Sequence, residues 1–315
     1  MEHKRHHYIP QCYLRGFSTN EKSVWVYNKS LSKMYQTSVD KIFYEKNFYA
    51  VDMDLVPEDG RDKINVNSIE YEFFAEHIES QYADILNAIN KSTNEWKEIP
   101  RYLLCGRIPE CWVDYLSMQL LIQYIRTPEA REEALELLEL SKLHMKALSD
   151  SPLCSDEERL YYEKESQRTH GEAIDHFMIL FDKERVIDPY CSLLKNKIWS
   201  IYYSPEADFF TSDAPIILER EGENKKVNFL ELNLSQLHIT YPITRHLLVR
   251  LWDRESYKVL EPYDRMIRIV DKEFVMAENI RQYVWARKEI VTPNKELDFF
   301  EKIRNIRNEE FYCKH

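Results

Sequence analysis

The first part of the chain combines a short helix pattern with two alternating segments. Pro10 suits the first turn of a helix, where its missing N–H costs nothing, so we expect a short helix over residues 10–17. Apolar and polar side chains alternate over residues 23–28 and 33–39, which is typical of strands with one buried face. The short polar connection between these two segments predicts a hairpin.

The middle of the chain is dominated by helical periodicity. Apolar residues recur at helical spacing over residues 67–90, which predicts an amphipathic helix. A second helix is expected to begin near Pro109 and to reach about residue 148, with a kink or interruption at Pro128. The highly charged segment 156–183 predicts another long helix.

Short β-branched or aromatic segments follow, and turn residues bound them. They predict strands at residues 197–203, 214–218, 237–241, 246–252 and 283–290. Helices are expected over residues 264–282 and 294–307. We therefore predict one α+β domain (residues 1–315), mostly helical, whose helical middle segment spans about residues 67–184. Its mixed or antiparallel sheet would combine the amino-terminal hairpin with the strands of residues 197–290.

Composition disfavours several functional classes. The 315-residue chain carries a net charge of -11, which argues against a general nucleic-acid coat but not against a local basic pocket. It has 5 glycines and contains neither G-x-x-x-x-G-K-[ST] nor G-x-G-x-x-G, so P-loop and Rossmann-type enzymes are disfavoured. It also lacks the G-x-S-x-G elbow of α/β-hydrolases. Its 6 cysteines include no C-x-x-C pair, which disfavours structural zinc.

The sequence predicts a cytoplasmic protein without a membrane partner. No segment approaches the roughly 18 apolar residues that a membrane-spanning helix needs. The polar opening residues are not followed by the apolar region of a secretory signal. Reduced cysteines would fit that location.

Two predicted helices carry polar side chains on apolar faces. Glu70 and His77 fall among the apolar residues of the first, whereas a buried carboxylate needs a partner or a raised pKa. A half-exposed Glu70 stabilised by the helix dipole is the alternative. On the second, Gln119, Gln123 and Arg126 share one side, which predicts a lined cavity or a buried network. Arg126 suits a phosphate or carboxylate ligand, and a structural ion pair is its alternative. Three acids are expected on the solvated side of the first helix: Glu72, Glu76 and Glu79.

The opening segment concentrates groups that bind metals or anions. His7, Gln11 and Arg15 follow at spacings of four residues, so a helix that begins early would direct them toward one cavity. Imidazole is a common metal ligand, which makes His6 and His7 candidates for a zinc or nickel site. A His-rich end that binds stray metal is an equally good interpretation.

A second polar group lies between apolar segments near residue 212. Thr211, Ser212 and Asp213 would stand at the end or edge of a strand, where binding sites commonly form. Asp213 is a candidate general base or metal ligand. The alternative is a turn stabilised by these side chains and closed by Pro215.

Five segments of the chain resemble the signature of a bacterial family, domain-of-unknown-function family 4238. The first, His7-Tyr8-Ile9-Pro10-Gln11-x-Tyr13-Leu14-x-x-Phe17, resembles its opening H-Y-[VI]-P-Q-x-[YF]-L-x-x-F. The others are residues 46–49 (E-N-x-Y, with Lys46 for Glu), 126–128 (R-T-P), 210–215 (F-[IL]-T-S-D-N-P, with Ala214 for Asn) and 241–245 (Y-P-[LI]-[ST]-P, with Arg245 for Pro). The resemblance implies no activity. It implies that the polar segments chosen on physical grounds coincide with signature segments.

The leading hypothesis is a hydrolase, such as a nuclease, that acts on a phosphate-containing or nucleic-acid substrate, with a divalent metal as candidate cofactor. Its catalytic residues would be His7, Asp213 and Glu70. The substrate would be bound by Gln11, Arg15, Gln119, Gln123, Arg126, Thr211 and Ser212. The alternative is a non-catalytic sensor or interaction module that binds a small anion, a nucleotide or a protein partner. A purely structural polar network is a third hypothesis. The distribution of the family suggests phage defence as a context.

Overall fold

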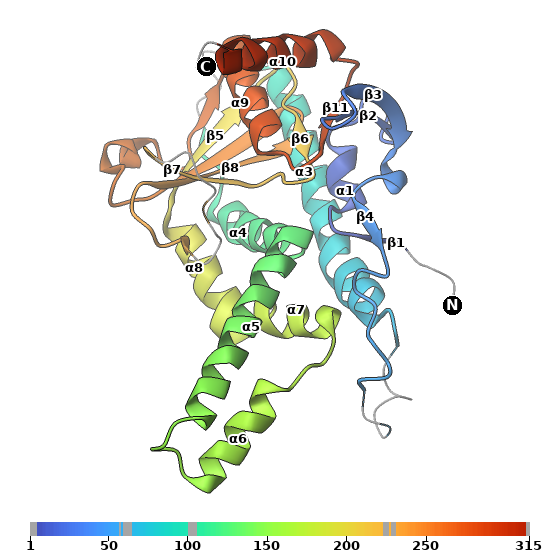
Figure 1. Ribbon diagram of the computed structural model, residues 1–315. Helices are drawn as coiled ribbons and strands as arrows, with labels where there is room; N and C mark the ends of the chain where they lie inside the picture. Colours follow the sequence, from blue (N-terminus) through green and yellow to red (C-terminus); the bar gives the residue numbers. More distant parts are fainter. Residues whose placement is uncertain are drawn as a thin grey trace.

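Two open sheets built from distant parts of the chain stand side by side in the upper half of Figure 1. The computed structural model describes residues 5–56, 58, 65–99, 106–222, 227 and 231–312, with side chains to residue 305. One sheet has 5 strands in the order β10-β5-β9-β8-β7, and the other has 4 in the order β3-β2-β11-β6. A separate ribbon pairs β1 (Arg5–His7) with β4 (Tyr44–Lys46).

The five-stranded sheet is covered on both faces. Its strands are β5 (Ile198–Tyr203), β7 (Ile217–Arg220), β8 (Leu237–Thr244), β9 (Leu247–Trp252) and β10 (Ile267–Ile269). β10 runs parallel to β5, and the other neighbours are antiparallel. Along β5, Trp199 belongs to the main core, whereas Tyr202 packs with Val275 on the opposite face. Burial on both faces explains the continuous apolar run of this strand.

The amino-terminal hairpin belongs to the four-stranded sheet. This sheet contains β2 (Ser23–Asn28), β3 (Lys33–Ser38), β6 (Thr211–Ser212) and β11 (Glu289–Thr292). β11 lies between β2 and β6, and all the pairings are antiparallel. The expectation that the hairpin joins later strands is therefore confirmed. The strands form two sheets, because β6 pairs with β11 whereas β7, which follows it in the chain, pairs with β8.

The helices provide the lower half of the molecule and a cap above the sheets (Figure 1). The α-helices are α1 (Gln11–Arg15), α3 (Ser80–Lys97), α4 (Glu110–Ile125), α5 (Pro128–Ser149), α6 (Asp156–Ser166), α7 (Glu172–Leu180), α8 (Asp188–Asn196), α9 (Lys272–Trp285) and α10 (Leu297–Tyr312). The described residues also form the π-helices η2 (Ile69–Glu79) and η4 (Lys183–Ile187) and the 3₁₀-helices η1 (Val39–Lys41) and η6 (Lys258–Tyr263). With about 50% helix and 19% strand, the predicted α+β class is confirmed. None of the helices in the described ranges has the length and apolar character needed to cross a bilayer.

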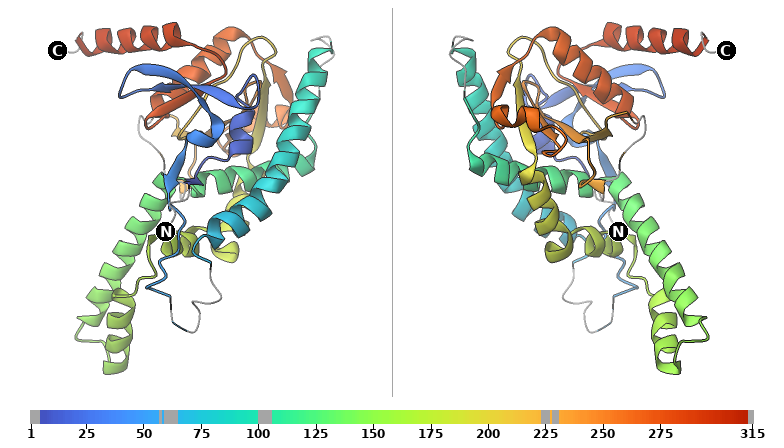
Figure 2. Two further views of the ribbon diagram at one scale, coloured as in Figure 1. Left: turned by 90° about the vertical axis from the view of Figure 1, so that its right-hand side faces the viewer. Right: turned by 90° about the vertical axis from the view of Figure 1, so that its left-hand side faces the viewer.

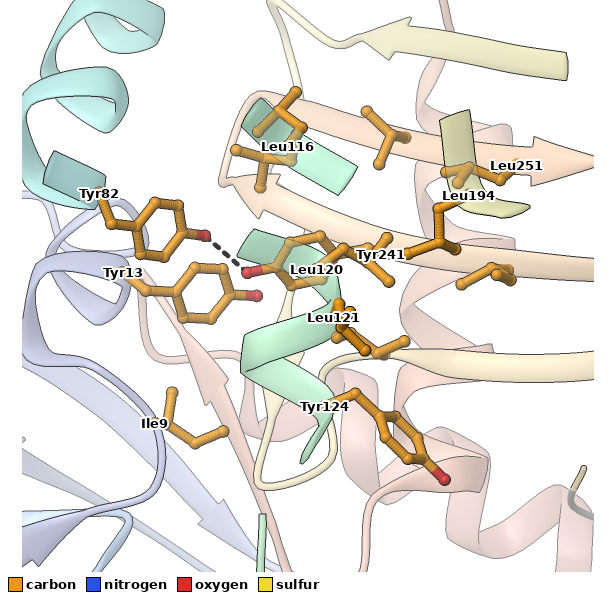
Figure 3. Close-up of a cluster of buried hydrophobic side chains, with 14 of the residues drawn as sticks. Ile9, Tyr13, Tyr82, Leu116, Leu120, Leu121, Tyr124, Leu194, Tyr241 and Leu251 are labelled. Carbon is orange, nitrogen blue, oxygen red and sulfur yellow. Dashed lines mark hydrogen bonds between the residues drawn. The ribbon is translucent and has the colours of Figure 1, made fainter. Parts of the chain in front are cut away.

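Helices α5 and α6 form an antiparallel hairpin that projects away from the sheets, as Figure 2 shows from two sides. The main hydrophobic core lies at the other end of the helical half. There α3, α4 and α8 meet one face of the five-stranded sheet, and Figure 3 shows side chains of α1, α4, β8 and β9 converging at this point. Leu120 of α4 and Leu251 of β9 are fully buried in it. That the whole chain forms one domain stays a prediction.

The predicted helix boundaries are wrong in two places, each for a local reason. The segment 156–183 is not one helix, because α6 ends at Ser166 and Gly171 has a φ of 88°, which favours glycine. The segment 264–282 begins with β10 and becomes helical only at Lys272, where the Asp271 side chain accepts a hydrogen bond from the Phe274 N–H. Because α9 continues to Trp285, the strand predicted at 283–290 starts later, as β11.

The interruption expected at Pro128 is confirmed. Helix α4 ends at Ile125, and α5 begins at Pro128 with Thr127 as its N-cap. The Thr127 hydroxyl accepts a hydrogen bond from the Ala130 N–H at 3.3 Å and donates one to the Tyr124 carbonyl at 2.7 Å. One buried side chain therefore joins the two helices.

We expect Thr127→Ala to lower the free energy of unfolding by about 1–2 kcal/mol, because it removes the N-cap oxygen of α5. Urea titration followed by circular dichroism measures the change. Thr127→Ser, which keeps the oxygen, is the matched control and should retain most of the stability. Equal losses in the two variants would contradict the capping role.

Candidate functional site

The opening signature segment contacts the other signature segments. The Arg126 Nη2 donates to the His7 carbonyl at 2.5 Å. The Tyr49 N–H donates to His6 Nδ1 at 2.8 Å, and the Tyr49 hydroxyl donates to the Arg126 carbonyl. At the other end of the segment, the Tyr13 hydroxyl donates to the Pro242 carbonyl at 2.6 Å. The opening segment therefore contacts segments 46–49 and 126–128 near its start and segment 241–245 near its end.

Three tyrosines hold α1 against the sheets, and Figure 3 shows their hydroxyl groups gathered together. The Tyr13 ring stacks on Tyr241 at a centroid distance of 5.4 Å. The Tyr82 and Tyr241 hydroxyls are 2.7 Å apart, and the Tyr13 hydroxyl lies 2.8 Å from Thr211 Oγ1. Burial raises the pKa of Tyr13 and of Tyr241 well above the usual value, so both stay neutral. Thr211, fully buried, is a partner in this network.

A second buried cluster surrounds the peptide of His7. Arg126 is fully buried, and its Nη2 lies 2.9 Å from Glu79 Oε1 as well as against the His7 carbonyl. Its guanidinium also lies 4.3 Å from the ring centroid of Phe74. Glu70 Oε1 accepts a hydrogen bond from the His7 N–H at 3.2 Å. We call Glu70, Glu79, Gln123 and Arg126 the Arg126 centre.

Burial disfavours the charged forms of the ionisable side chains in the Arg126 centre. Burial raises the pKa of Glu70 to about 7, and the nearby Glu79 adds to the increase although Arg126 opposes it. Burial alone would lower the pKa of Arg126, but Glu79, Tyr49 and Glu70 raise it above its usual value. Four buried atoms have no hydrogen-bond partner among the described residues: Glu70 Oε2, Gln123 Oε1, Arg126 Nε and Arg126 Nη1. Such unsatisfied groups are uncommon in folded proteins and often accompany function.

The predicted residues of the opening segment have different surroundings. The imidazole of His7 is buried, its Nε2 lies 3.2 Å from the Asp40 carbonyl, and burial lowers its pKa, so the ring is neutral at pH 7. Gln11 is half-buried and Arg15 is exposed, and neither side chain has a hydrogen bond to a described residue. Gln119 is buried one turn before Gln123 in α4.

The Thr211-Ser212-Asp213 segment is fully engaged in hydrogen bonds. Ser212 Oγ donates to Gln282 Oε1 at 3.0 Å. Asp213 Oδ1 accepts from the N–H of Arg287 at 2.9 Å, and Oδ2 accepts from the N–H groups of Lys288 and Glu289 at 2.7 and 3.0 Å. Burial raises the Asp213 pKa, although these three amides oppose the shift. The carboxylate therefore closes the turn between α9 and β11.

The structure divides the predicted site residues into two groups. His7, Glu70, Gln123 and Arg126 lie together in the Arg126 centre, whereas Thr211–Asp213 contact α1, α9 and β11 instead. A joint catalytic role for His7, Glu70 and Asp213 stays a prediction. Within the described ranges, no group of three or more His, Cys, Asp or Glu residues is arranged to hold a metal ion.

Tyr8 connects the two groups. The Gln123 Nε2 donates to the Tyr8 carbonyl at 3.3 Å. Tyr8 also lines a cleft of about 460 Å³, together with Asp213. We call this space the tyrosine cleft. Its lining comprises Tyr8, Tyr35, Lys41, Ile42, Phe43, Tyr44, Glu45, Pro128, Glu132, Asp213, Arg287, Lys288 and Glu289. Three signature segments therefore contribute to the lining, through Tyr8, Pro128 and Asp213.

Most of the acids in the tyrosine cleft already have partners. Glu132 lies 3.0 Å from the Arg287 guanidinium. Glu289 accepts hydrogen bonds from the side chains of Asn28 and Tyr35 at 2.9 and 3.0 Å. By contrast, the side chains of Lys41, Glu45 and Lys288 form no hydrogen bond or ion pair with any other residue that the structure describes. The cleft thus offers two lysines and one carboxylate to a ligand.

The hydroxyl of Tyr8 is a potential hydrogen-bond donor in the cleft. Burial and the carboxylates of Asp213, Glu289 and Glu45 raise the Tyr8 pKa, so the hydroxyl keeps its proton. It forms no hydrogen bond within the described parts of the chain. A ligand acceptor in the tyrosine cleft would satisfy it.

For two residues of the first long helix, the predicted side of the helix, buried or solvated, is wrong. His77 is exposed, not buried, and Glu79 faces Arg126, not the solvent. The reason is that η2 is a π-helix, whose hydrogen bonds run from i to i+5, so a wheel with 3.6 residues per turn misplaces its later residues. Of the cleft residues, Tyr8 was within reach of the sequence, because it belongs to the opening signature. No feature of the sequence distinguishes Lys41 or Lys288 from other lysines.

Comparison with known proteins gives one match. The model of a family described as a protein of unknown function, DUF4238, matches residues 5–296. Searches of curated proteins and of solved structures gave no match. The family match includes all the residues of the Arg126 centre and of the tyrosine cleft.

We expect Glu70→Gln to stabilise the protein increasingly as the pH rises from 5 to 8. The pKa of Glu70 is raised to about 7 in the folded protein, so folding favours its protonated form. The wild type therefore loses stability as the pH rises through about 4.5 to 7, by about 2–3 kcal/mol in all, whereas glutamine does not titrate. Urea titrations at pH 5, 6, 7 and 8 give the difference between the two proteins. A difference that does not change with pH would contradict the raised pKa.

We expect Asp213→Asn to lower the free energy of unfolding by about 1.5–3 kcal/mol, because an amide group cannot accept all three backbone hydrogen bonds. Urea titration measures the loss. Asp114→Asn, which breaks an exposed ion pair with Lys195, is the control and should change stability by less than about 1 kcal/mol. Similar stability of the two variants would count against the structural role of Asp213.

Proposed function

The chain belongs to the DUF4238 family, and we propose that its tyrosine cleft binds a nucleotide. The observation that carries the proposal is the composition of the cleft. It combines aromatic side chains with two lysines that have no acidic partner among the described residues. Residues of three signature segments belong to the lining, which associates the cleft with the family as a whole.

The charge of this part of the chain favours an anionic ligand. Residues 5–50 contain seven Lys or Arg residues and three Asp or Glu residues, in a chain whose net charge is -11. They supply Lys41 and the aromatic lining of the cleft. Among the charged residues that line the cleft, Glu132 pairs with Arg287, and Asp213 and Glu289 accept hydrogen bonds, so Lys41 and Lys288 remain as cations for phosphate groups.

The other lining groups suit a nucleoside. Tyr8, Tyr35 and Tyr44 offer ring surfaces for stacking, which does not depend on the identity of the base. The Tyr8 hydroxyl can donate to a ligand oxygen or nitrogen, and the Glu45 carboxylate can accept from an amino or hydroxyl group. A cleft of about 460 Å³ also lies within the range of small-molecule sites.

Recognition is better supported than hydrolysis. Backbone amides take three of the roughly four lone-pair sites of the Asp213 carboxylate, which leaves little capacity for a general base or metal ligand. The neutral His7 imidazole is held against the Asp40 carbonyl, away from the cleft lining. We therefore favour a sensor of nucleotides over an enzyme. Hydrolysis, phage defence and a cytoplasmic location stay predictions from the sequence.

We expect calorimetry to show that ATP binds the wild-type protein, and that adenosine or tripolyphosphate alone binds more weakly. Lys41→Ala combined with Lys288→Ala should weaken ATP binding by about tenfold, because two phosphate contacts are lost. Lys33→Ala is the matched control, because it removes an exposed lysine of β3 outside the cleft lining. The Lys33→Ala variant should bind ATP with the affinity of the wild type.

Three outcomes would overturn the proposal. The first is no ATP binding by the folded wild type, and the second is an equal loss of affinity in the Lys33→Ala control. The third is phosphate release from ATP, with magnesium present, that Asp213→Asn abolishes without loss of folding. That result would favour the hydrolase instead.

A further inference from the structure

Side chains of the Arg126 centre hold both backbone polar groups of one residue. Glu70 accepts from the His7 N–H, and Arg126 donates to the His7 carbonyl. The next carbonyl, that of Tyr8, accepts from Gln123. Three consecutive peptide groups, from His6–His7 to Tyr8–Ile9, are therefore held by side chains of η2 and of the end of α4.

This anchor uses more charge than anchoring requires. Neutral amides could bind the same backbone groups at a lower desolvation cost. Instead the chain buries Arg126 with Glu70 and the partly buried Glu79, and four buried atoms have no partner among the described residues. Expensive arrangements of this kind persist where the position of a group matters.

The side chain that depends most directly on this anchor is Tyr8. Its ring contacts Phe43 and Phe48 in tilted arrangements, at centroid distances of 6.1 and 6.4 Å. Its hydroxyl is directed by no hydrogen bond within the described residues. The direction of the Tyr8 side chain into the tyrosine cleft is thus set by its backbone and by its aromatic neighbours.

We propose that Glu70, Gln123 and Arg126 are positioning residues, which hold the His7–Tyr8 backbone so that Tyr8 is oriented for the nucleotide before it binds. They contact the His7–Tyr8 backbone and are not part of the cleft lining. Pre-organisation of this kind raises affinity because the ligand does not have to order the contacting group itself. The inference rests on the proposed function of the tyrosine cleft.

The test is a double-mutant cycle on ATP binding, measured by calorimetry. Glu70→Ala and Gln123→Ala should each weaken ATP binding by about tenfold in the wild-type background. In a Tyr8→Ala background, where no ring remains to be oriented, each should change the affinity by less than about twofold. A residue that only stabilises the fold would give the same factor in both backgrounds.

Two further variants separate positioning from general damage. Glu70→Gln keeps an oxygen acceptor for the His7 N–H, so it should restore affinity close to that of the wild type. Ser117→Ala removes another buried hydrogen bond of α4, to the Val113 carbonyl, and should leave ATP affinity unchanged. Circular dichroism and thermal unfolding of each variant verify that it is folded. If Glu70→Ala does not fold, the cycle with Gln123→Ala decides alone.

The outcomes distinguish the two proposals. Absence of ATP binding by the wild type overturns the proposed function. Normal binding by the wild type, together with unchanged affinity in the folded Gln123→Ala variant, overturns the positioning role and leaves the function intact. Equal factors in the wild-type and Tyr8→Ala backgrounds also overturn the positioning role.

Discussion

The buried guanidinium of Arg126 is the constraint on which much of the structure depends. A charged group without access to water must find hydrogen bonds and an opposite charge, and breaking such an arrangement costs several kcal/mol. Arg126 obtains them from the His7 carbonyl in β1 and from Glu79 in η2. The end of α4 is thereby fixed to the amino-terminal ribbon and to the π-helix. The ribbon in turn supplies Tyr44 and Glu45 of β4 to the tyrosine cleft.

The aromatic residues extend this constraint to the sheets. Tyr49 joins the Arg126 carbonyl to His6, and Tyr13 joins α1 to β6 and β8. In each case one hydroxyl or imidazole satisfies backbone or hydroxyl groups that burial would otherwise leave unpaired. The signature segments of the family are therefore the places where separate elements complete one another's hydrogen bonds. Their spacing in the sequence reflects this assembly as much as any chemistry.

Local patterns predicted the elements of the fold well. The hairpin, the break at Pro128 and the strands near residues 197–252 follow from periodicity, turn residues and capping, which act within a few positions. The two helix-boundary errors have local causes at Gly171 and Asp271, and the other errors arose where long-range packing decides. The π-helical turns of η2 reversed the expected sides of His77 and Glu79, and the division into two sheets depends on the pairing of β6 with β11. Neither can be read from local spacing.

The same distinction explains which site residues the sequence revealed. A polar side chain on an apolar face is visible as a break in the pattern, so the buried Glu70, Gln123 and Arg126 were identified. Lysines at the edge of a cleft look like any solvated lysine, so Lys41 and Lys288 were not. A break in an apolar pattern thus reveals buried polar groups that support a site. It does not reveal exposed groups that would contact a ligand. In this fold the two sets meet at Tyr8, whose backbone belongs to the support and whose ring belongs to the cleft.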